Sequence, residues 1–108
     1  MEGMNKLKEL EYLNMAVNSV AKIEGLNRCE TLNKLDLTLN FVDVEDLQES
    51  YENLDWCPVL DELTLTGNPC TDWPNYREYT IAKIPQLKRL DGEDITKSER
   101  LAAKTRLE

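Results

Sequence analysis

The chain is predicted to be an α/β solenoid with a parallel concave sheet and a helical or 3₁₀ convex side. The first observation is leucine at L-x-x-L-x-L spacing with an asparagine three residues further on. The copies are Leu10-Leu13-Met15 with Asn18, Leu32-Leu35-Leu37 with Asn40, and Leu60-Leu63-Leu65 with Asn68. The second observation is a set of apolar residues that recurs between the strands in the same register. Such a unit cannot bury its apolar side alone, so successive units stack.

The pattern L-x-x-L-x-L-x-x-N is the leucine-rich-repeat signature. The distances from Leu10 to Leu32, to Leu60 and to Leu87 divide the chain into units within the usual range of roughly 20–29 residues. Leu87-x-x-Leu90 begins a further copy that breaks at Asp91-Gly92. The apolar residues of the returns are Met4, Leu7, Leu26, Cys29, Leu54, Cys57, Ile81 and Ile84. We therefore assign 1–86 to repeats and 87–108 to a C-terminal cap of the same single domain.

The first long return is predicted to contain a helix. Asp43 is a suitable N-cap, because a short carboxylate accepts hydrogen bonds from the first free N–H groups. Leu47, Tyr51 and Leu54 follow at i, i+4 and i+7 and therefore share one inward face. Pro58 ends the segment.

The next return is predicted to hold a second helix, capped by Thr71 or Asp72, with Pro74 in its first turn. Pro85 stops this helix. Its inward residues are Ile81 and Ile84, with Trp73 and Tyr76 above them. Arg77 is expected at the edge of that face, with its stem over apolar surface and its head in water.

The last helix is predicted to open at Thr96-x-x-Glu99, which is a capping box. Leu101 and Leu107 are its expected inward residues. At the other end, Met1-Glu2-Gly3-Met4 occupies the register of Ile23-Glu24-Gly25-Leu26. The chain thus starts within a repeat and shows no N-terminal cap, so we expect further repeats upstream.

Asn18, Asn40 and Asn68 stand where the chain turns from each strand into the interior. An asparagine side chain offers two donors and an acceptor, which can satisfy the buried backbone of such a turn. We expect the three residues to form a structural ladder, and not to bind a ligand.

Composition favours one domain and disfavours several classes of function. The formal net charge is -8, which would repel a phosphate backbone, so nucleic acid is not an expected partner. Uncharged runs are too short to span a bilayer, and a membrane is not expected either. The segment 43–62 carries acidic residues and no basic one. That segment is a candidate surface for a basic partner, although a solvated acidic face is the simpler interpretation.

The chain has no sign of enzymatic chemistry or of a cofactor. It contains no histidine for acid–base work and no Gly-rich phosphate loop. Cys29, Cys57 and Cys70 fall at inward apolar repeat positions without the close pairing of a metal site. We therefore expect buried free thiols, no catalytic residue, no metal and no cofactor.

Strand alternation points the residues between the leucines to the concave face. One row is Tyr12, Lys34, Glu62 and Arg89; the next is Asn14, Asp36, Thr64 and Asp91; a third is Ala16, Thr38 and Thr66. Protein-binding residues are expected in the first two rows, because tyrosine and arginine favour protein contacts. The simpler possibility, that Lys34 and Glu62 only pair with each other, is compatible with this.

The segments Leu65-Thr66-Gly67-Asn68-Pro69-Cys70, Tyr76-Arg77-Glu78-Tyr79 and Leu90-Asp91-Gly92 closely resemble the tilB family of leucine-rich-repeat proteins. The resemblance covers nearly the whole chain. It implies a non-enzymatic scaffold in a cytoplasmic factor that preassembles axonemal dynein arms with chaperones and other assembly factors. Motile cilia or flagella need such factors, and the cilium is a second expected location. The alternative is a stable structural or regulatory subunit, of the axonemal dynein light-chain or phosphatase-regulator type.

Overall fold

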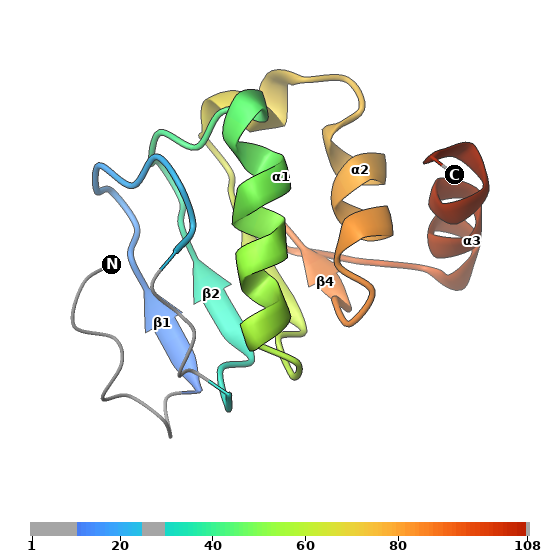
Figure 1. The fold of residues 1–108 in the computed structure, drawn as a ribbon, viewed down its shortest axis with the longest axis horizontal. Coiled ribbons are helices and arrows are strands. Elements are labelled where there is room, and N and C mark those ends of the chain that lie inside the picture. Colours follow the sequence, from blue (N-terminus) through green and yellow to red (C-terminus); the bar gives the residue numbers. More distant parts are fainter. Residues whose placement is uncertain (1–10, 25–29, 108) are drawn as a thin grey trace.

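A computed structural model describes residues 11–24 and 30–107 and shows a leucine-rich-repeat solenoid (Figure 1). Four parallel strands follow in chain order: β1 Tyr12–Asn14, β2 Lys34–Asp36, β3 Glu62–Thr64 and β4 Arg89–Leu90. β5, Glu93–Asp94, returns antiparallel to β4. The predicted fold class is confirmed. The expected repeat positions Met4, Leu7, Leu10, Leu26 and Cys29 lie outside the described residues, as does Leu107's side chain.

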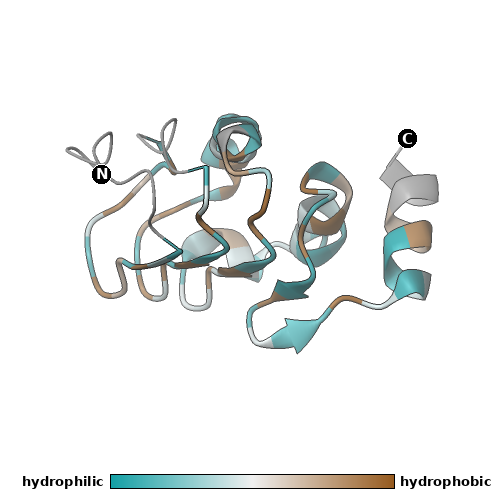
Figure 2. Cartoon of the chain, turned by 90° about the horizontal axis from the view of Figure 1, so that it is seen from below, coloured by the Kyte–Doolittle hydropathy of each residue, from teal (hydrophilic) through white to brown (hydrophobic). Residues whose placement is uncertain are grey.

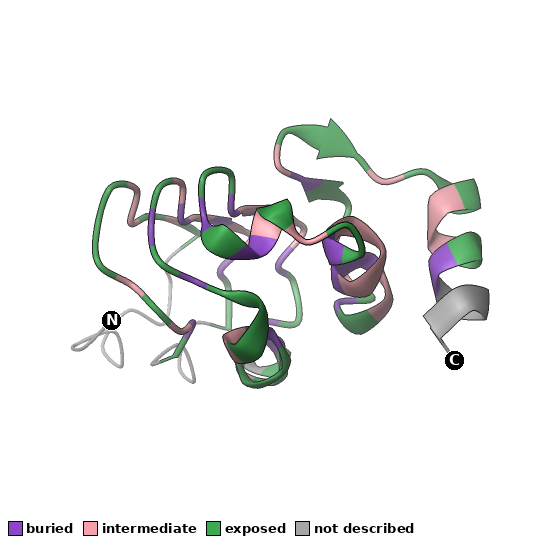
Figure 3. Cartoon of the chain, turned by 90° about the horizontal axis from the view of Figure 1, so that it is seen from above, coloured by how far each residue is buried: buried purple, intermediate pink, exposed green. Residues whose placement is uncertain are grey.

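The core lies behind the sheet and is built from the repeat leucines. Leu13, Leu35, Leu63 and Leu90 occupy one register across the four parallel strands. Leu35 and Leu63 have no exposed surface, whereas their neighbours along the strand are partly open. Figure 3 shows this alternation of buried and open positions along the turns of the solenoid. In Figure 2 hydrophobic and hydrophilic segments alternate along the same turns. Burial of the leucine side chains is the main favourable term for a fold of this kind.

The return after β2 forms α1, Val44–Asn53, followed by the 3₁₀ turn η2, Leu54–Trp56. Asp43 caps α1 and accepts a hydrogen bond from the N–H of Val44 at 2.7 Å. Leu47, Tyr51 and Leu54 are buried, as the i, i+4, i+7 spacing predicts. The helix, its cap and its inward face predicted for this return are therefore confirmed.

The return after β3 differs from the prediction. It consists of the 3₁₀ turn η3, Pro69–Asp72, and the helix α2, Tyr76–Lys83. The expected start at Thr71 or Asp72, with Pro74 in the first turn, is wrong. Trp73 precedes a proline and adopts ψ 127°, because a proline ring clashes with a helical conformation of the residue before it. The helix can therefore begin no earlier than Pro74, and it begins at Tyr76.

The last helix, α3, spans Lys97–Leu107 and begins at the predicted capping box. The N–H of Glu99 donates to Thr96 Oγ1 at 3.0 Å, and the N–H of Thr96 donates to Glu99 Oε1 at 3.2 Å. Leu101 is 68% exposed, so its predicted inward position is wrong, and Ala103 is buried in its place. Arg100 lies toward α2, where its guanidinium donates to the carbonyl oxygens of Ile81 and Leu87.

Candidate functional site

The candidate site is the concave face of the sheet, where short parallel strands align side chains of successive repeats. Tyr12 pairs in register with Lys34, Lys34 with Glu62, and Glu62 with Arg89. The structure thus brings together the first predicted row, and we call these four residues the first concave row. Tyr12 and Arg89 are exposed, and Lys34 and Glu62 are partly exposed. A partner that lies across the strands can contact all four at once.

Each cation of the first concave row has a nearby anion. Lys34 Nζ lies 3.4 Å from Glu62 Oε2 and 5.1 Å from the centroid of the Tyr12 ring. Arg89 Nε lies 2.9 Å from Asp94 Oδ1. Ion pairs at such open sites contribute little to stability, so they orient the side chains more than they hold the fold. Asp94 was not among the predicted residues, and only the Asp91-Gly92 turn, which folds β5 back, brings it here.

The second row is bound to its own backbone. Asn14 Oδ1 accepts from the N–H of Ala16 at 2.9 Å, and Asp36 Oδ1 accepts from the N–H of Thr38 at 3.0 Å. Thr64 continues the row opposite Asp36. In Asn14 and Asp36, one side-chain oxygen is already hydrogen-bonded to the backbone just after the strand. They are therefore less available to a partner than the first concave row.

Asp91, the last predicted member of the second row, has a structural connection. Its Oδ1 accepts from the N–H of Leu65 at 2.7 Å and its Oδ2 accepts from the hydroxyl of Tyr76 at 2.8 Å. Burial raises the pKa of Tyr76, and the charge of Asp91 adds to this rise, so the phenol stays protonated and can donate. Asp91 therefore joins β3, β4 and α2 beneath the concave face.

The asparagines lie in the turns behind the strands. Asn68 is buried; its amide donates to the carbonyls of Leu37 and Leu65, and its Oδ1 accepts from the N–H of Val42. Asn40 makes the equivalent bonds one repeat earlier, to the carbonyls of Met15 and Leu37 and from the N–H of Val20. Asn18 is exposed and donates to Met15 and Ala16 in its own turn. Each of the two buried asparagines thus joins its own turn to the preceding one.

The residue before each asparagine has left-handed backbone, a feature that the leucine spacing does not reveal. The φ angles are 56° at Val17, 56° at Leu39 and 84° at Gly67. A β-branched or bulky residue rarely adopts this conformation. Gly67 adopts it most readily because it has no Cβ, and a Cβ there would lie 2.5 Å from Leu39 Cδ2, so the exposed Leu39 side chain would have to move. The third predicted row, Ala16, Thr38 and Thr66, is thus followed in each repeat by a turn with a left-handed residue at the same position.

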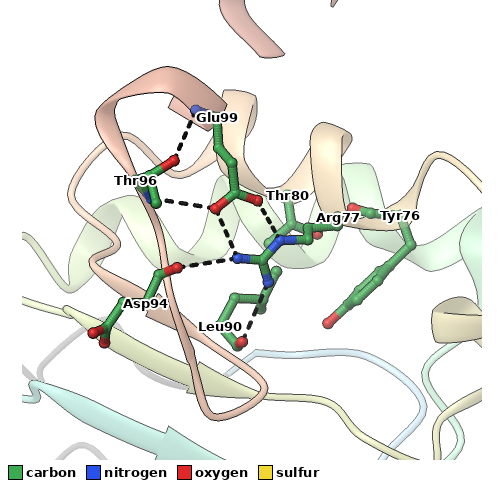
Figure 4. Close-up of polar contacts among 7 residues, drawn as sticks. All are labelled: Tyr76, Arg77, Thr80, Leu90, Asp94, Thr96 and Glu99. Atoms are coloured by element: carbon green, nitrogen blue, oxygen red, sulfur yellow. Dashed lines mark hydrogen bonds and ion pairs between the residues drawn. The ribbon is translucent and has the colours of Figure 1, made fainter. Parts of the chain in front are cut away.

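The cap behind β4 is held by Arg77, whose partly exposed guanidinium is bound by cap residues where we predicted that it would lie only in water (Figure 4). Arg77 Nε lies 2.7 Å from Glu99 Oε2, and its terminal nitrogens donate to the carbonyls of Leu90 and Asp94. Glu99 is also the capping residue of α3. Because α3 returns to α2, the guanidinium meets this carboxylate at a partly exposed site, which sequence spacing could not show.

Metal-ligand clusters and activated thiols are the two other features to look for among the described residues. Within 11–24 and 30–107, no group of three or more histidine, cysteine, aspartate or glutamate side chains could hold a metal ion. Cys57 and Cys70 are buried and form no disulfide with each other, and burial raises the pKa of the Cys70 thiol to about 12. A thiol with so high a pKa is not an activated nucleophile. No helix in this part of the chain has the length and apolar content to cross a membrane.

A family model described as leucine-rich repeat matches residues 1–108. The chain is 51% identical over 105 residues to dynein axonemal assembly factor 11 of Trypanosoma brucei brucei, covering 96% of this chain and 26% of that protein. Identity is 50% over 107 residues to protein tilB of Drosophila melanogaster, covering 95% of this chain and 25% of that one. It is 45% over 104 residues to the Mus musculus factor 11, covering 95% and 21%. The chain thus spans about a quarter of the length of these relatives.

Solved structures show the same fold. The chain superimposes on a chain of the Drosophila melanogaster SNF/U2A′ complex with a TM-score of 0.71 and 26% identity, covering 93% of this chain and 70% of that one. For the Mex67 leucine-rich-repeat domain of Chaetomium thermophilum the TM-score is 0.66 with 26% identity, covering 94% and 68%. The tilB-like resemblance drawn from the repeat and cap motifs is confirmed by these relatives.

Proposed function

This chain belongs to the leucine-rich-repeat family, and we propose that it is the protein-binding part of a factor that assembles axonemal dynein arms. Its relatives are named for that role, but the chain spans only about a quarter of their length. The proposed action is non-enzymatic and cytoplasmic, with the cilium or flagellum as a second location. The proposed partners are other assembly factors or chaperones. The whole protein's role is inferred from these relatives.

The observation that carries the proposal is the first concave row. Its aromatic ring and charged groups lie in register on an open face, while the buried turns behind them hold the strands. Amphipathic aromatic and arginine side chains supply much of the energy at protein interfaces. Because the row is already oriented by its own ion pairs, less side-chain freedom is lost when a partner binds. Asn14, Asp36, Thr64 and Asp91 support this surface from the second row.

The experiment is affinity purification of the tagged chain from ciliated cells, with mass spectrometry of the recovered proteins. Tyr12→Ala, Lys34→Ala and Arg89→Ala are combined in one variant. The matched control combines Phe41→Ala, Lys22→Ala and Lys97→Ala. It also removes one aromatic side chain and two positive charges, but all three residues lie outside the first concave row. We expect dynein-arm assembly proteins to be recovered with the parent and with the control, and to be absent from the material recovered with the concave variant. Recovery of only proteins unrelated to dynein assembly would refute the proposed role.

A further inference from the structure

The convex side contains a groove that the concave surface does not use. It lies between α1 and α2, has a volume of about 380 Å³, and is lined by Gln48, Tyr51, Glu52, Asp55, Tyr79 and Lys83. This volume falls at the lower end of the roughly 300–1,000 Å³ that ligand sites occupy. Figure 1 shows the two helices side by side in front of the sheet, so the groove opens away from the concave strands.

One wall of the groove is aromatic and held in place. The Tyr51 and Tyr79 rings lie 5.9 Å apart, and Trp73 packs edge-on to Tyr79 at 5.6 Å. The Tyr51 hydroxyl hydrogen-bonds Thr80 Oγ1 at 2.6 Å, which fixes that ring from below. Tyr79 is only partly buried and presents the accessible ring. A fixed aromatic ring at the edge of a groove is a surface for a flat or cationic group.

The other wall is acidic. Glu52 and Asp55 belong to the segment 43–62, which contains no basic residue. The ion pairs found among the described residues use Glu49, Glu62, Glu99 and Asp94, and none of them uses Glu52 or Asp55. Partial burial raises the pKa of the Tyr79 phenol, and the nearby charge of Glu52 raises it further. The negative potential of the acidic wall therefore extends to the aromatic ring.

The chain itself places a cation at this site. Lys83 Nζ lies 5.8 Å from the centroid of the Tyr79 ring. This distance is within the roughly 6 Å at which an ammonium group is attracted by a ring face. Lys83 is exposed and comes from the last turn of α2, so its long side chain can leave the ring without disturbing the fold.

We propose that this groove binds a basic segment of a protein partner, with an arginine side chain over Tyr79 and its charge beside Glu52 and Asp55. Arginine fits better than lysine, because its planar guanidinium can stack on the ring and bind a carboxylate through two donors. Lys83 covers the ring when the groove is empty and is displaced on binding. Charge complementarity with the acidic return selects a basic occupant.

The test uses the isolated chain labelled with ¹⁵N and blocked tripeptides as probes. Acetyl-Ala-Arg-Ala-amide is compared with acetyl-Ala-Gln-Ala-amide at millimolar concentration by amide chemical shifts. We expect the arginine peptide to shift the resonances of α1 and α2 around Glu52 and Tyr79, and the glutamine peptide to leave them unchanged. Equal shifts with both peptides, shifts spread over all acidic segments, or no shift would each overturn the proposal.

Two variants separate the groove from general surface charge. Glu52→Gln with Asp55→Asn should reduce the affinity for the arginine peptide at least several-fold. Lys83→Ala should increase it a few-fold, whereas Lys97→Ala, which removes the same charge from α3, should leave it unchanged. Equal gains from both lysine variants would show an effect of net charge alone and overturn the proposal. Circular dichroism of each variant establishes that it is folded.

A second copy of the chain is the competing occupant. Sedimentation at rising concentration distinguishes the two, because a partner site leaves the chain monomeric. A dimer that dissociates in the variant with Glu52→Gln and Asp55→Asn would assign the groove to self-association and overturn the proposed partner.

Discussion

The first concave row and the turns behind it lie a few residues apart in every repeat, yet they use polar side chains in opposite ways. Lys34 and Glu62 meet at a partly open surface, 3.4 Å apart, where water competes for both charges. Asn40 and Asn68 are buried and satisfy backbone groups of two successive turns. Loss of a surface ion pair leaves groups that water can solvate, whereas loss of a buried amide leaves groups that it cannot reach.

This difference separates stability from binding within one repeat. Neutral amides suit the buried turns, because a charge there would have to be removed from water. Charged and aromatic groups suit the open row, where they can exchange their weak internal contacts for contacts with a partner. The cap combines the two patterns, since Arg77 and Glu99 are charged but partly buried between α2 and α3. We therefore expect substitutions in the three places to affect different properties.

The largest effect should come from deletion of residues 87–108. This removes β4, β5 and α3 and leaves Leu63 of β3 without its covering turn, because an uncapped solenoid exposes its core. We expect aggregation, or loss of a cooperative thermal transition, measured by sedimentation and circular dichroism. A shortened chain that stays soluble, monomeric and cooperative would show that these residues are not the cap.

Next in size is the replacement of the buried asparagines. Asn40→Ala and Asn68→Ala should each lower the free energy of unfolding by about 1–3 kcal/mol, because buried backbone groups lose their partners. Asn18→Ala is the matched control, since Asn18 is exposed and its hydrogen bonds to the described residues stay within its own turn. It should cost less than about 0.5 kcal/mol. Equal urea midpoints for all three variants would contradict a structural role for the buried pair.

A smaller effect is expected for the cap ion pair, and it depends on pH. Hydrogen bonding to Arg77 holds the pKa of Glu99 below its usual value of 4.5. The ionised carboxylate therefore stabilises the fold above that value, and this contribution disappears as pH falls through the lowered folded pKa. Glu99→Gln should flatten the fall of the melting temperature between neutral and acidic pH. A fall as steep as that of the parent would exclude Glu99 as a source of acid sensitivity.

The smallest effect on stability should come from the first concave row. A double-mutant cycle with Lys34→Ala and Glu62→Ala should give a coupling of roughly 0.2–1 kcal/mol, typical of exposed pairs. High salt should reduce this coupling, because screening acts on charges that water reaches. A salt-independent coupling of several kcal/mol would mean that the row holds the fold, and the contrast with the buried turns would fail.

Much of this architecture can be predicted from the residues, and the rest depends on contacts distant in sequence. Strand register follows from the leucine spacing, and the capping box at Thr96 and Glu99 follows from local chemistry. The start of α2 is set by the steric effect of Pro74 on Trp73, which the helical pattern alone does not reveal. Arg77 meets Glu99 and Arg100 meets the carbonyl of Ile81 only because α3 folds back on α2. For the same reason Leu101 faces outward.

The concave site was less predictable than the fold. Strand alternation gave the rows, but Asn14, Asp36 and Asp91 turned out to bond their own or a neighbouring strand. The ion pair of Asp94 with Arg89 could not be predicted without knowing the β4–β5 turn. The left-handed conformation of Val17 and Leu39 could not be predicted without the backbone coordinates. A side chain's direction can be derived from periodicity, whereas its availability to a partner depends on hydrogen bonds that periodicity does not encode.

The most direct measurement is the affinity of a co-purified partner for two variants, each paired with its melting temperature. One variant combines Tyr12→Ala, Lys34→Ala and Arg89→Ala; the other reverses charge in the acidic return with Glu45→Lys and Glu52→Lys. We expect the concave variant to lose about tenfold or more in affinity, or about 1.4 kcal/mol, with little change in melting temperature. Parental affinity of the concave variant, together with failure of the charge-reversed one, would contradict binding by the concave face and place the partner on α1.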